Sequence, residues 1–238
     1  MPDDTVADPR ADRPGSTAEH ALQQRLGTAA RADRFYADQV CDHLLPTMDE
    51  FVARMSMVFV ASSDADGACD SSVRVGPPGF VAVLDPGHLA WPEHAGDAST
   101  ARRANVAANP HVGLLMVDFV EDLIGLHVNG RATVCPDAAL RAEHPQLPAE
   151  PVPGRAVEAW VVVEVEEAYI HCRKHIPRMR SVDGTGTGAT AEAGDPRRRS
   201  GDFFGAARSR GAEGTSGRTR PGRPGRLRVP AAEASPAG

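Results

Sequence analysis

Cysteine is scarce in this chain of 238 residues, and its four cysteines stand too far apart to form a CxxC pair. Paired metal-binding cysteines and the framework of a disulfide-rich secreted domain are therefore excluded. The opening residues, MPDDTVADPRADRPGS, are acidic and polar, unlike a secretory signal. We therefore expect a protein of the reducing cytoplasm.

Long apolar runs are also missing. The longest are MVFVA, VGLLMV and WVVVEV, well short of the ~18 apolar residues that a membrane-spanning helix needs, so we expect no membrane partner. No Gly-x-Ser-x-Gly, Walker or paired-carboxylate pattern supports a hydrolase or a nucleoside triphosphatase. Lysine is almost absent, since Lys174 is the only one among 26 basic residues, and we attribute this to the base composition of the gene.

Positive charge is concentrated at one end of the chain. Residues 197–238 contain ten arginines and three acids, whereas the rest carries 16 basic and 29 acidic residues. This balance argues against a nucleic-acid partner, and we expect the arginine-rich segment to be mostly solvated.

The composition predicts one domain with polar ends. We expect residues 1–17 to be disordered, because they contain almost no large apolar side chain. Residues 18–180 form the predicted domain. Residues 181–238 read as a mostly disordered Gly/Arg-rich tail, with a short ordered patch near 195–208 that contains the two aromatics of GDFFGAAR.

Apolar residues recur every three or four positions between Thr17 and Met55, which predicts helices interrupted at Gly27 and Pro46. Two further short helices are expected over 97–109 and 136–144. After Tyr169, the segment IHCRKHIPRMR is expected to form a helix that closes the domain.

The periodicity changes to two between Ser56 and Val134, which indicates strands with one face toward a core. Asp64–Gly67 and Asp85–Gly87 have the composition of hairpin turns. Short, turn-linked strands predict a mainly β fold with flanking helices, an antiparallel barrel of six to seven strands that closes its edges. The strands are expected at 56–63, 70–75, 80–84, 88–92, 112–119, 124–134 and 159–166.

The turn from Gly96 to Thr100, GDAST, precedes a predicted helix. The first N–H groups of a helix have no partners within it and favour an anion, to which the hydroxyls of Ser99 and Thr100 would add hydrogen bonds. In the alternative interpretation, Asp97 or Ser99 simply caps the helix.

Arginines provide the second half of an anion site. Arg74 lies near the end of a predicted strand, and a guanidinium binds phosphate through two parallel hydrogen bonds. Arg102 and Arg103 are secondary candidates. A solvated surface role is the alternative for all three.

Other side chains have two interpretations each. Trp91 would stack on a cofactor ring or belong to the core or a subunit interface. His127, on the polar face of its strand, would contact a cofactor edge, or it would lie in solvent or at an interface. His171, Cys172 and His175 have ligand spacing, but without further ligands we predict no metal site.

Several stretches together resemble the pyridoxamine 5′-phosphate oxidase-like, FMN-binding split-barrel family. They lie between about Leu22 and Arg180. These stretches are MSMVFVASSDADGACDSSVRVGPPGFV, HLAWPE, NPHVGLLMVDF, IGLHVNGRA and VVVEVEEAYIHCRKHI.

The resemblance implies a split-barrel homodimer with FMN in a groove between protomers. It places Arg74 at the position of the strand arginine that reaches the cofactor phosphate, with Val75 next to it. It places Trp91 and Pro92 along the flavin. Lys174 would lie near the groove, either as an anion contact or as part of a structural helix end. Gly96 and Asp97 would fall on the family's phosphate turn. With Ser99, Thr100, Arg102 and His127, proposed above from the residues themselves, they complete the candidate cofactor-binding residues.

The turn departs from the family pattern, because GDASTARRAN has Asp97 where asparagine is usual. The function implied is an FMN-dependent oxidoreductase that transfers a hydride between a small-molecule substrate and the flavin. Two alternatives remain: a deazaflavin-dependent reductase on the same barrel, and a non-catalytic flavin-binding or interaction module.

The phosphate role of Arg74 gives a first prediction. The Arg74→Ala variant should bind FMN about 2–3 kcal/mol more weakly, because a charge-assisted hydrogen-bond pair is lost. Titration of the variant with FMN measures this, and an unchanged dissociation constant would exclude the assignment.

Overall fold

The computed structural model describes residues 14–94 and 100–180. The chain divides after Asp195 into two units, and all described residues belong to the first. Residues 1–13 and 181–238 of the expected disordered ends, with the patch near 195–208, lie outside the described residues, as do the candidates Gly96, Asp97 and Ser99. Residues 14–17, which were also expected to be disordered, are described, and Thr17 begins the first helix.

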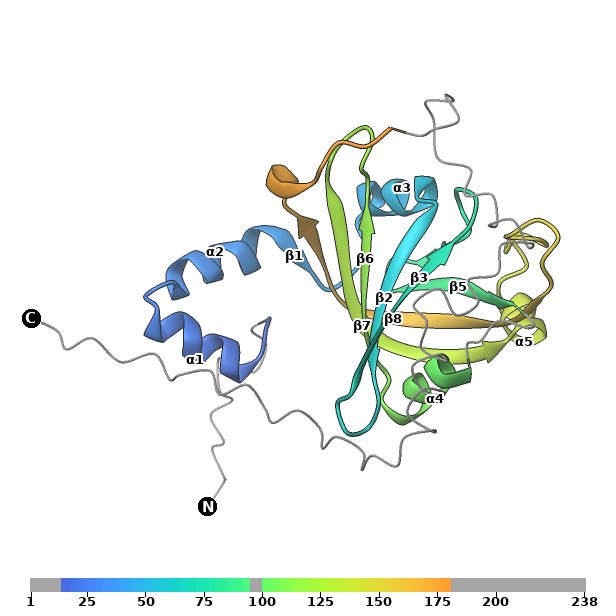
Figure 1. Cartoon of the computed structure of the whole chain (residues 1–238), viewed down its shortest axis with the longest axis horizontal. Coiled ribbons are helices and arrows are strands. Elements are labelled where there is room, and N and C mark those ends of the chain that lie inside the picture. The colour runs from blue at the N-terminus through green and yellow to red at the C-terminus, as the bar shows by residue number, and fades with distance from the viewer. Residues whose placement is uncertain (1–13, 95–99, 181–238) are drawn as a thin grey trace, which may run out of the picture. The chain divides into compact units, whose positions relative to one another are not determined.

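An antiparallel sheet forms the body of the described chain (Figure 1). Its strands follow the order β3-β2-β6-β7-β8-β5-β4, and the two-residue β1 pairs with β8. All seven predicted strands are present with shifted ends, so the mainly β split-barrel prediction is confirmed, and β1 was not foreseen. The bounds are β1 Val40–Cys41, β2 Met57–Ser63, β3 Cys69–Val75, β4 Ala82–Asp85, β5 His88–His94, β6 His111–Val117, β7 Gly125–Pro136 and β8 Val157–His171.

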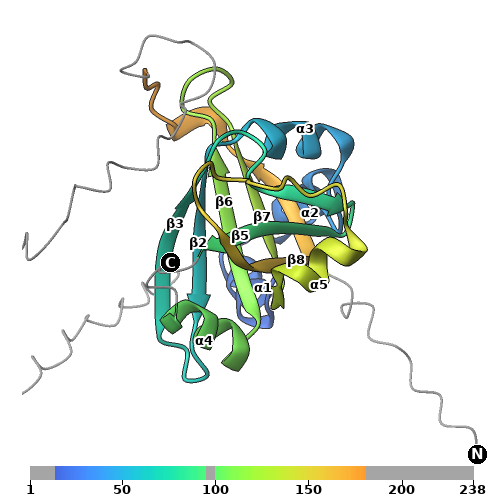
Figure 2. The same cartoon turned by 90° about the vertical axis from the view of Figure 1, so that its right-hand side faces the viewer.

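The sheet does not close, so the expected edge closure is wrong. Within the described residues, β3 and β4 end the strand order and share no ladder. Figure 2 shows β3 beside β2 and β5 beside β8. The connection from β3 to β4 explains the opening, because it buries Phe80 and Val81 in the core instead of turning directly into a hairpin.

The N-terminal helices follow the predicted breaks. Gly27 ends the first helix with a φ of 67°, and Pro46 begins the third, where a missing N–H costs nothing. The helices are α1 Thr17–Arg25, α2 Ala29–Gln39, α3 Pro46–Arg54, α4 Thr100–Ala108 and α5 Asp137–Glu143.

The helix expected after Tyr169 is wrong. β8 continues to His171, whose register partner is Gly125 of β7, and only a single 3₁₀ turn, η1, follows at Arg173–His175. The continued ladder satisfies the backbone groups that a helix would otherwise have paired. Pro177, two residues after η1, has no N–H to extend it as a helix.

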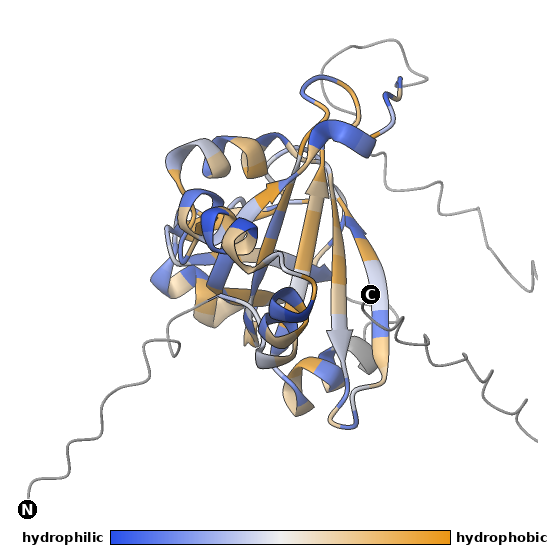
Figure 3. Ribbon diagram, turned by 90° about the vertical axis from the view of Figure 1, so that its left-hand side faces the viewer, coloured by the Kyte–Doolittle hydropathy of each residue, from blue (hydrophilic) through white to orange (hydrophobic). Residues whose placement is uncertain are grey.

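The core lies on one face of the strands, as their alternation requires. Val58 and Val60 of β2 and Leu114 and Met116 of β6 point inward, whereas their neighbours are more exposed. Figure 3 shows hydrophobic residues along the strands of the sheet. Both predicted turns are confirmed, with Asp64 accepting the N–H of Ala68 and Asp85 that of Gly87.

None of the described helices is both long and apolar enough to cross a membrane.

A bulge between β7 and β8 brings two backbones into close approach. The register shifts between Asn129 and Gly130. A Cβ on Gly130 would lie 2.0 Å from the carbonyl oxygen of Glu164, whereas a Cβ on Gly113 of β6 would meet nothing closer than 3.4 Å. The bulge therefore requires glycine at 130.

The Gly130→Ala variant should lower the free energy of unfolding by about 3 kcal/mol or more, because the backbone of β8 must move. Urea denaturation measures this. Gly113→Ala is the matched control and should change stability by less than about 1 kcal/mol. Equal effects of the two substitutions would contradict this account of the bulge.

Candidate functional site

A buried ion pair joins the strands on the two sides of the open sheet. Arg74 lies opposite Val58 in the β2–β3 register and points inward, as does every second residue of β3. Its Nε and Nη2 donate to Oε1 of Glu93 on β5, at 2.9 Å and 2.7 Å. Its Nη1 donates to Ser72 Oγ and the Val73 carbonyl, both at 3.3 Å. The guanidinium is thus held on three nitrogens.

Trp91 donates to the same carboxylate oxygen. Its Nε1 lies 3.0 Å from Glu93 Oε1, and its ring is buried in the core. The structure therefore gives Trp91 the core environment that the sequence left as an alternative, and a contact with a flavin ring stays a prediction.

The second oxygen of Glu93 differs from the first. Oε2 receives no hydrogen bond from the described residues, although the side chain is only 2% exposed. A buried polar atom without a partner costs about 1–3 kcal/mol, and more when it is charged. This atom is therefore the most conspicuous unsatisfied group among the described residues.

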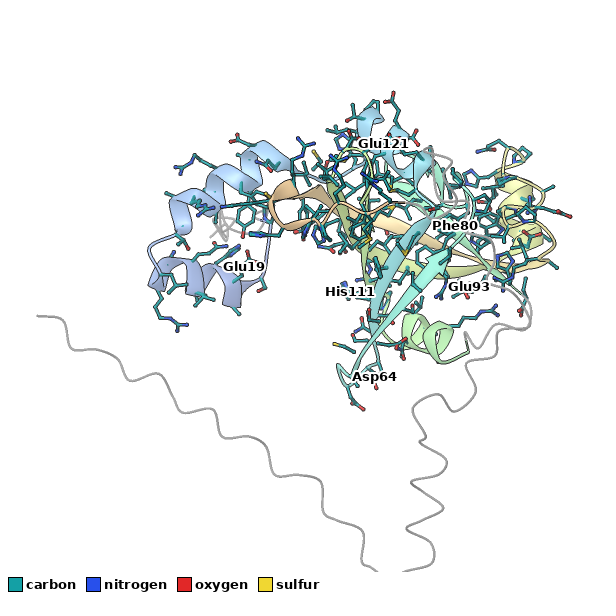
Figure 4. The ribbon with its side chains drawn as sticks, turned by 45° about the horizontal axis from the view of Figure 1, so that its top comes forward. Glu19, Asp64, Phe80, Glu93, His111 and Glu121 are labelled. Atoms are coloured by element: carbon teal, nitrogen blue, oxygen red, sulfur yellow. The ribbon has the colours of Figure 1, made fainter. Side chains whose placement is uncertain are left out.

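A small void lies beside this carboxylate, under α4. It is lined by β2, β3, β5, β8 and α4, and its volume of about 10 Å³ fits about one water-sized group. Figure 4 shows Glu93 among the side chains of the barrel, on the side where α4 lies. Arg103 of α4 also borders the void and binds Glu158 through two hydrogen bonds of 3.0 Å and 3.1 Å.

The remaining predicted residues are distributed over several places. Val75 is exposed on the outer face of β3, and Pro92 is buried opposite Trp160 in the β5–β8 register. Thr100 and Arg102 belong to α4, but their side chains lie outside the described residues. Lys174 is exposed in η1. The structure thus gathers Arg74 and Trp91, and it adds Glu93.

His127 lies on the other face of the sheet. Its ring stacks on Tyr169 with centroids 4.8 Å apart, and its Nε2 is 2.9 Å from Nδ1 of His171. Burial, and then the charge of His171, lower the pKa of His127 below its usual 6.5. No group of three or more His, Cys, Asp or Glu side chains in the described residues is placed to hold a metal ion.

A second groove is not needed for the predicted site, since it contains none of the predicted residues. It has a volume of about 500 Å³ and lies between α3 and the ends of β7 and β8. Met48, Phe51 and Ile124 form part of its apolar lining. Arg54 on its rim is already paired with Asp118, Glu121 and Asp122, so its charge is compensated.

Sequence reasoning missed Glu93 because it ended the strand at Pro92. A signal was available, since residues two apart on a strand share a face, and the inward Trp91 requires an acceptor for its indole N–H. Extending β5 by two residues would have placed the carboxylate beside that N–H.

Residues 44–172, more than half of the chain, match the family model of pyridoxamine 5′-phosphate oxidase. The chain belongs to the pyridoxamine 5′-phosphate oxidase family. The match covers all strands from β2 to β8, and with them Arg74 and Glu93. The resemblance found in the sequence is thereby confirmed.

Solved structures of similar proteins include HupZ of Group A Streptococcus, with 19% identity, a TM-score of 0.42, and coverage of 52% of this chain and 91% of HupZ. HutZ, the heme storage protein of Vibrio cholerae, has 16% identity, a TM-score of 0.38, and coverage of 54% and 93%. An F420 reductase has 18% identity, a TM-score of 0.36, and coverage of 53% and 98%. No curated protein sequence matches this member of the pyridoxamine 5′-phosphate oxidase family.

Arg74 and Glu93 suit the hydroxyl-bearing chain of an FMN better than its phosphate. A phosphate beside Arg74 would meet a cation that Glu93 already neutralises, and it would lie close to that carboxylate. The unsatisfied Oε2 instead requires a hydrogen-bond donor, which a hydroxyl provides. These residues of the family member therefore fit the hydroxyl-bearing chain of FMN, and the phosphate role of Arg74 stays a prediction.

The lowered pKa of His127 predicts a pH dependence of stability. The unfolded chain takes up the proton at about pH 6.5, whereas the folded chain takes it up only at a lower pH. Stability should therefore fall as the pH drops below about 6.5, through the folded pKa.

Urea denaturation at pH 7.5 and pH 5.5 measures this loss. The His127→Phe variant keeps an aromatic ring on Tyr169 but has no titrating group, so it should lose less stability than the wild type over this range. Equal losses in both proteins would show that His127 does not contribute.

Proposed function

We propose that this chain is an FMN-binding oxidoreductase that transfers a hydride between a small-molecule substrate and the flavin. One observation supports this most: the family match covers a buried polar cluster, Arg74, Trp91 and Glu93, which offers an unsatisfied acceptor at the end of β5. The flavin supplies the redox chemistry, and the protein supplies binding and orientation.

The proposed phosphate site lies at the start of α4. Helix N-termini favour anions, and the sequence places Gly96, Asp97, Ser99, Thr100 and Arg102 there. Arg103, one residue further, is bound by Glu158. In this proposal the phosphate relies on the turn and on Arg102, and Arg74 holds the inner wall.

We also propose a homodimer in the cytoplasm, as the sequence resemblance implies. Exposed apolar side chains on the outer face support the dimer: Phe59 of β2 is 37% exposed, and Val73, its register partner on β3, is 46% exposed. Val75 on the same face of β3 is 41% exposed. Contiguous exposed apolar groups are typical of association surfaces.

Titration with FMN tests the proposed function. The purified chain should quench FMN fluorescence with saturation at one FMN per chain. Binding of a deazaflavin in place of FMN would favour the deazaflavin-dependent reductase. Binding of neither would contradict the proposal and favour a non-catalytic interaction module.

The phosphate site has its own variant. Arg102→Met should weaken FMN binding about tenfold or more, because a charge-assisted contact is lost, and should leave the binding of riboflavin, which has no phosphate, almost unchanged. Equal weakening of both ligands would place the phosphate elsewhere.

A further inference from the structure

The two oxygens of the Glu93 carboxylate have unequal surroundings. Oε1 accepts hydrogen bonds from two nitrogens of Arg74 and from Trp91, whereas Oε2 accepts none from the described part of the chain. The side chain is 98% buried. Natural structures leave few such atoms, and an ordered water, an ion or a ligand group is what commonly completes them.

A second carboxylate in the same chain shows the satisfied arrangement. Asp137 of α5 also accepts from an arginine and a tryptophan: Arg141 Nε reaches both of its oxygens, at 2.8 Å and 3.0 Å, and Trp160 Nε1 lies 2.7 Å from Oδ1. Both oxygens of Asp137 are thus occupied. The contrast shows that Arg–carboxylate–Trp geometry does not by itself leave an oxygen unsatisfied.

The void beside Glu93 limits what its missing partner can be. It has room for about one water-sized group, between the apolar side chains of Val106 and Val161 and the polar Ser62. Ser62 Oγ accepts from Asn105 at 3.4 Å and makes no hydrogen bond to Oε2. The charge of Glu93 is already balanced by Arg74, so no second cation is needed to neutralise the carboxylate. A phosphate monoester is largely ionised at neutral pH, so its oxygens have almost no hydrogen to donate and are repelled by the carboxylate. A hydroxyl group meets all three conditions.

We infer that Glu93 is a ligand-binding residue, whose Oε2 accepts a hydrogen bond from a hydroxyl of a polyol chain, and that Arg74 is its positioning residue. This inference rests on the proposed function, in which the polyol is the ribityl chain of the flavin. Arg74 fixes Oε1, and this leaves Oε2 directed at the ligand. The arginine thus acts through Glu93 and not on the phosphate.

Paired titrations with FMN and riboflavin test the inference, because both ligands carry the ribityl hydroxyls and only FMN carries the phosphate. The double variant Arg74→Met/Glu93→Met replaces the ion pair with apolar side chains of similar length, which buried sites tolerate. It should bind FMN and riboflavin about tenfold or more weakly, with the ratio of the two dissociation constants unchanged.

Single variants separate positioning from direct contact. Glu93→Gln keeps the shape but removes the charge, so it should weaken both ligands by a similar factor. Arg74→Met should do the same, and Arg74→Lys, which keeps a cation near Oε1, should recover part of the loss. Asp137→Asn is the control, since it alters the matching Arg–carboxylate–Trp cluster of α5, and it should leave both dissociation constants unchanged. Circular dichroism establishes that each variant is folded.

Two results would overturn the inference. Weaker binding of FMN alone in Arg74→Met would assign the arginine to the phosphate, and unchanged binding of both ligands in Glu93→Gln and in the double variant would show that Oε2 has no ligand. If the wild-type chain binds neither flavin, the proposed function itself is wrong.

Discussion

The ion pair between Arg74 and Glu93 links the parts of the sheet that the backbone leaves unpaired. β3 stands at one end of the strand order and β5 next to the other, and no described ladder joins them. A side-chain bond of 2.7 Å crosses instead. Burying both charges is costly, and removal of one partner typically destabilises a protein by about 3–5 kcal/mol. The pair therefore constrains the barrel opening and the electrostatics of the void beneath α4.

Because of this constraint, the Glu93 carboxylate can stabilise the fold with one oxygen and accept a hydrogen bond from a ligand with the other. Arg74 and Trp91 satisfy one oxygen and fix the plane of the carboxylate, while the other oxygen borders the void. In our proposal, the same opening separates two types of ligand contact: a hydroxyl beneath α4 and a phosphate at the start of that helix. For this member of the pyridoxamine 5′-phosphate oxidase family, we propose that the two contacts belong to different residues, Glu93 and Arg102.

Much of the fold could be predicted from local patterns. Alternation between Ile124 and Val134 identified β7, and Asp64, Gly67, Gly27 and Pro46 marked turns and helix ends through their own backbone preferences. The errors arose where long-range pairing decides. β8 continued to His171 because β7 offered a ladder partner, and the sheet stayed open because the segment after β3 entered the core. Likewise, Arg74 was identified from sequence, but its partner Glu93 lies 19 residues away on a strand whose end was predicted two residues too early.

A crystal structure of the chain with bound FMN tests the central claim most directly, through the atoms within reach of Glu93. The account predicts a ribityl hydroxyl at about 2.5–3.0 Å from Oε2, with Arg74 still bound to Oε1 and the phosphate at the start of α4. Arg74 turned away from Glu93 and bound to the phosphate would contradict it, as would an FMN whose hydroxyls lie away from Oε2.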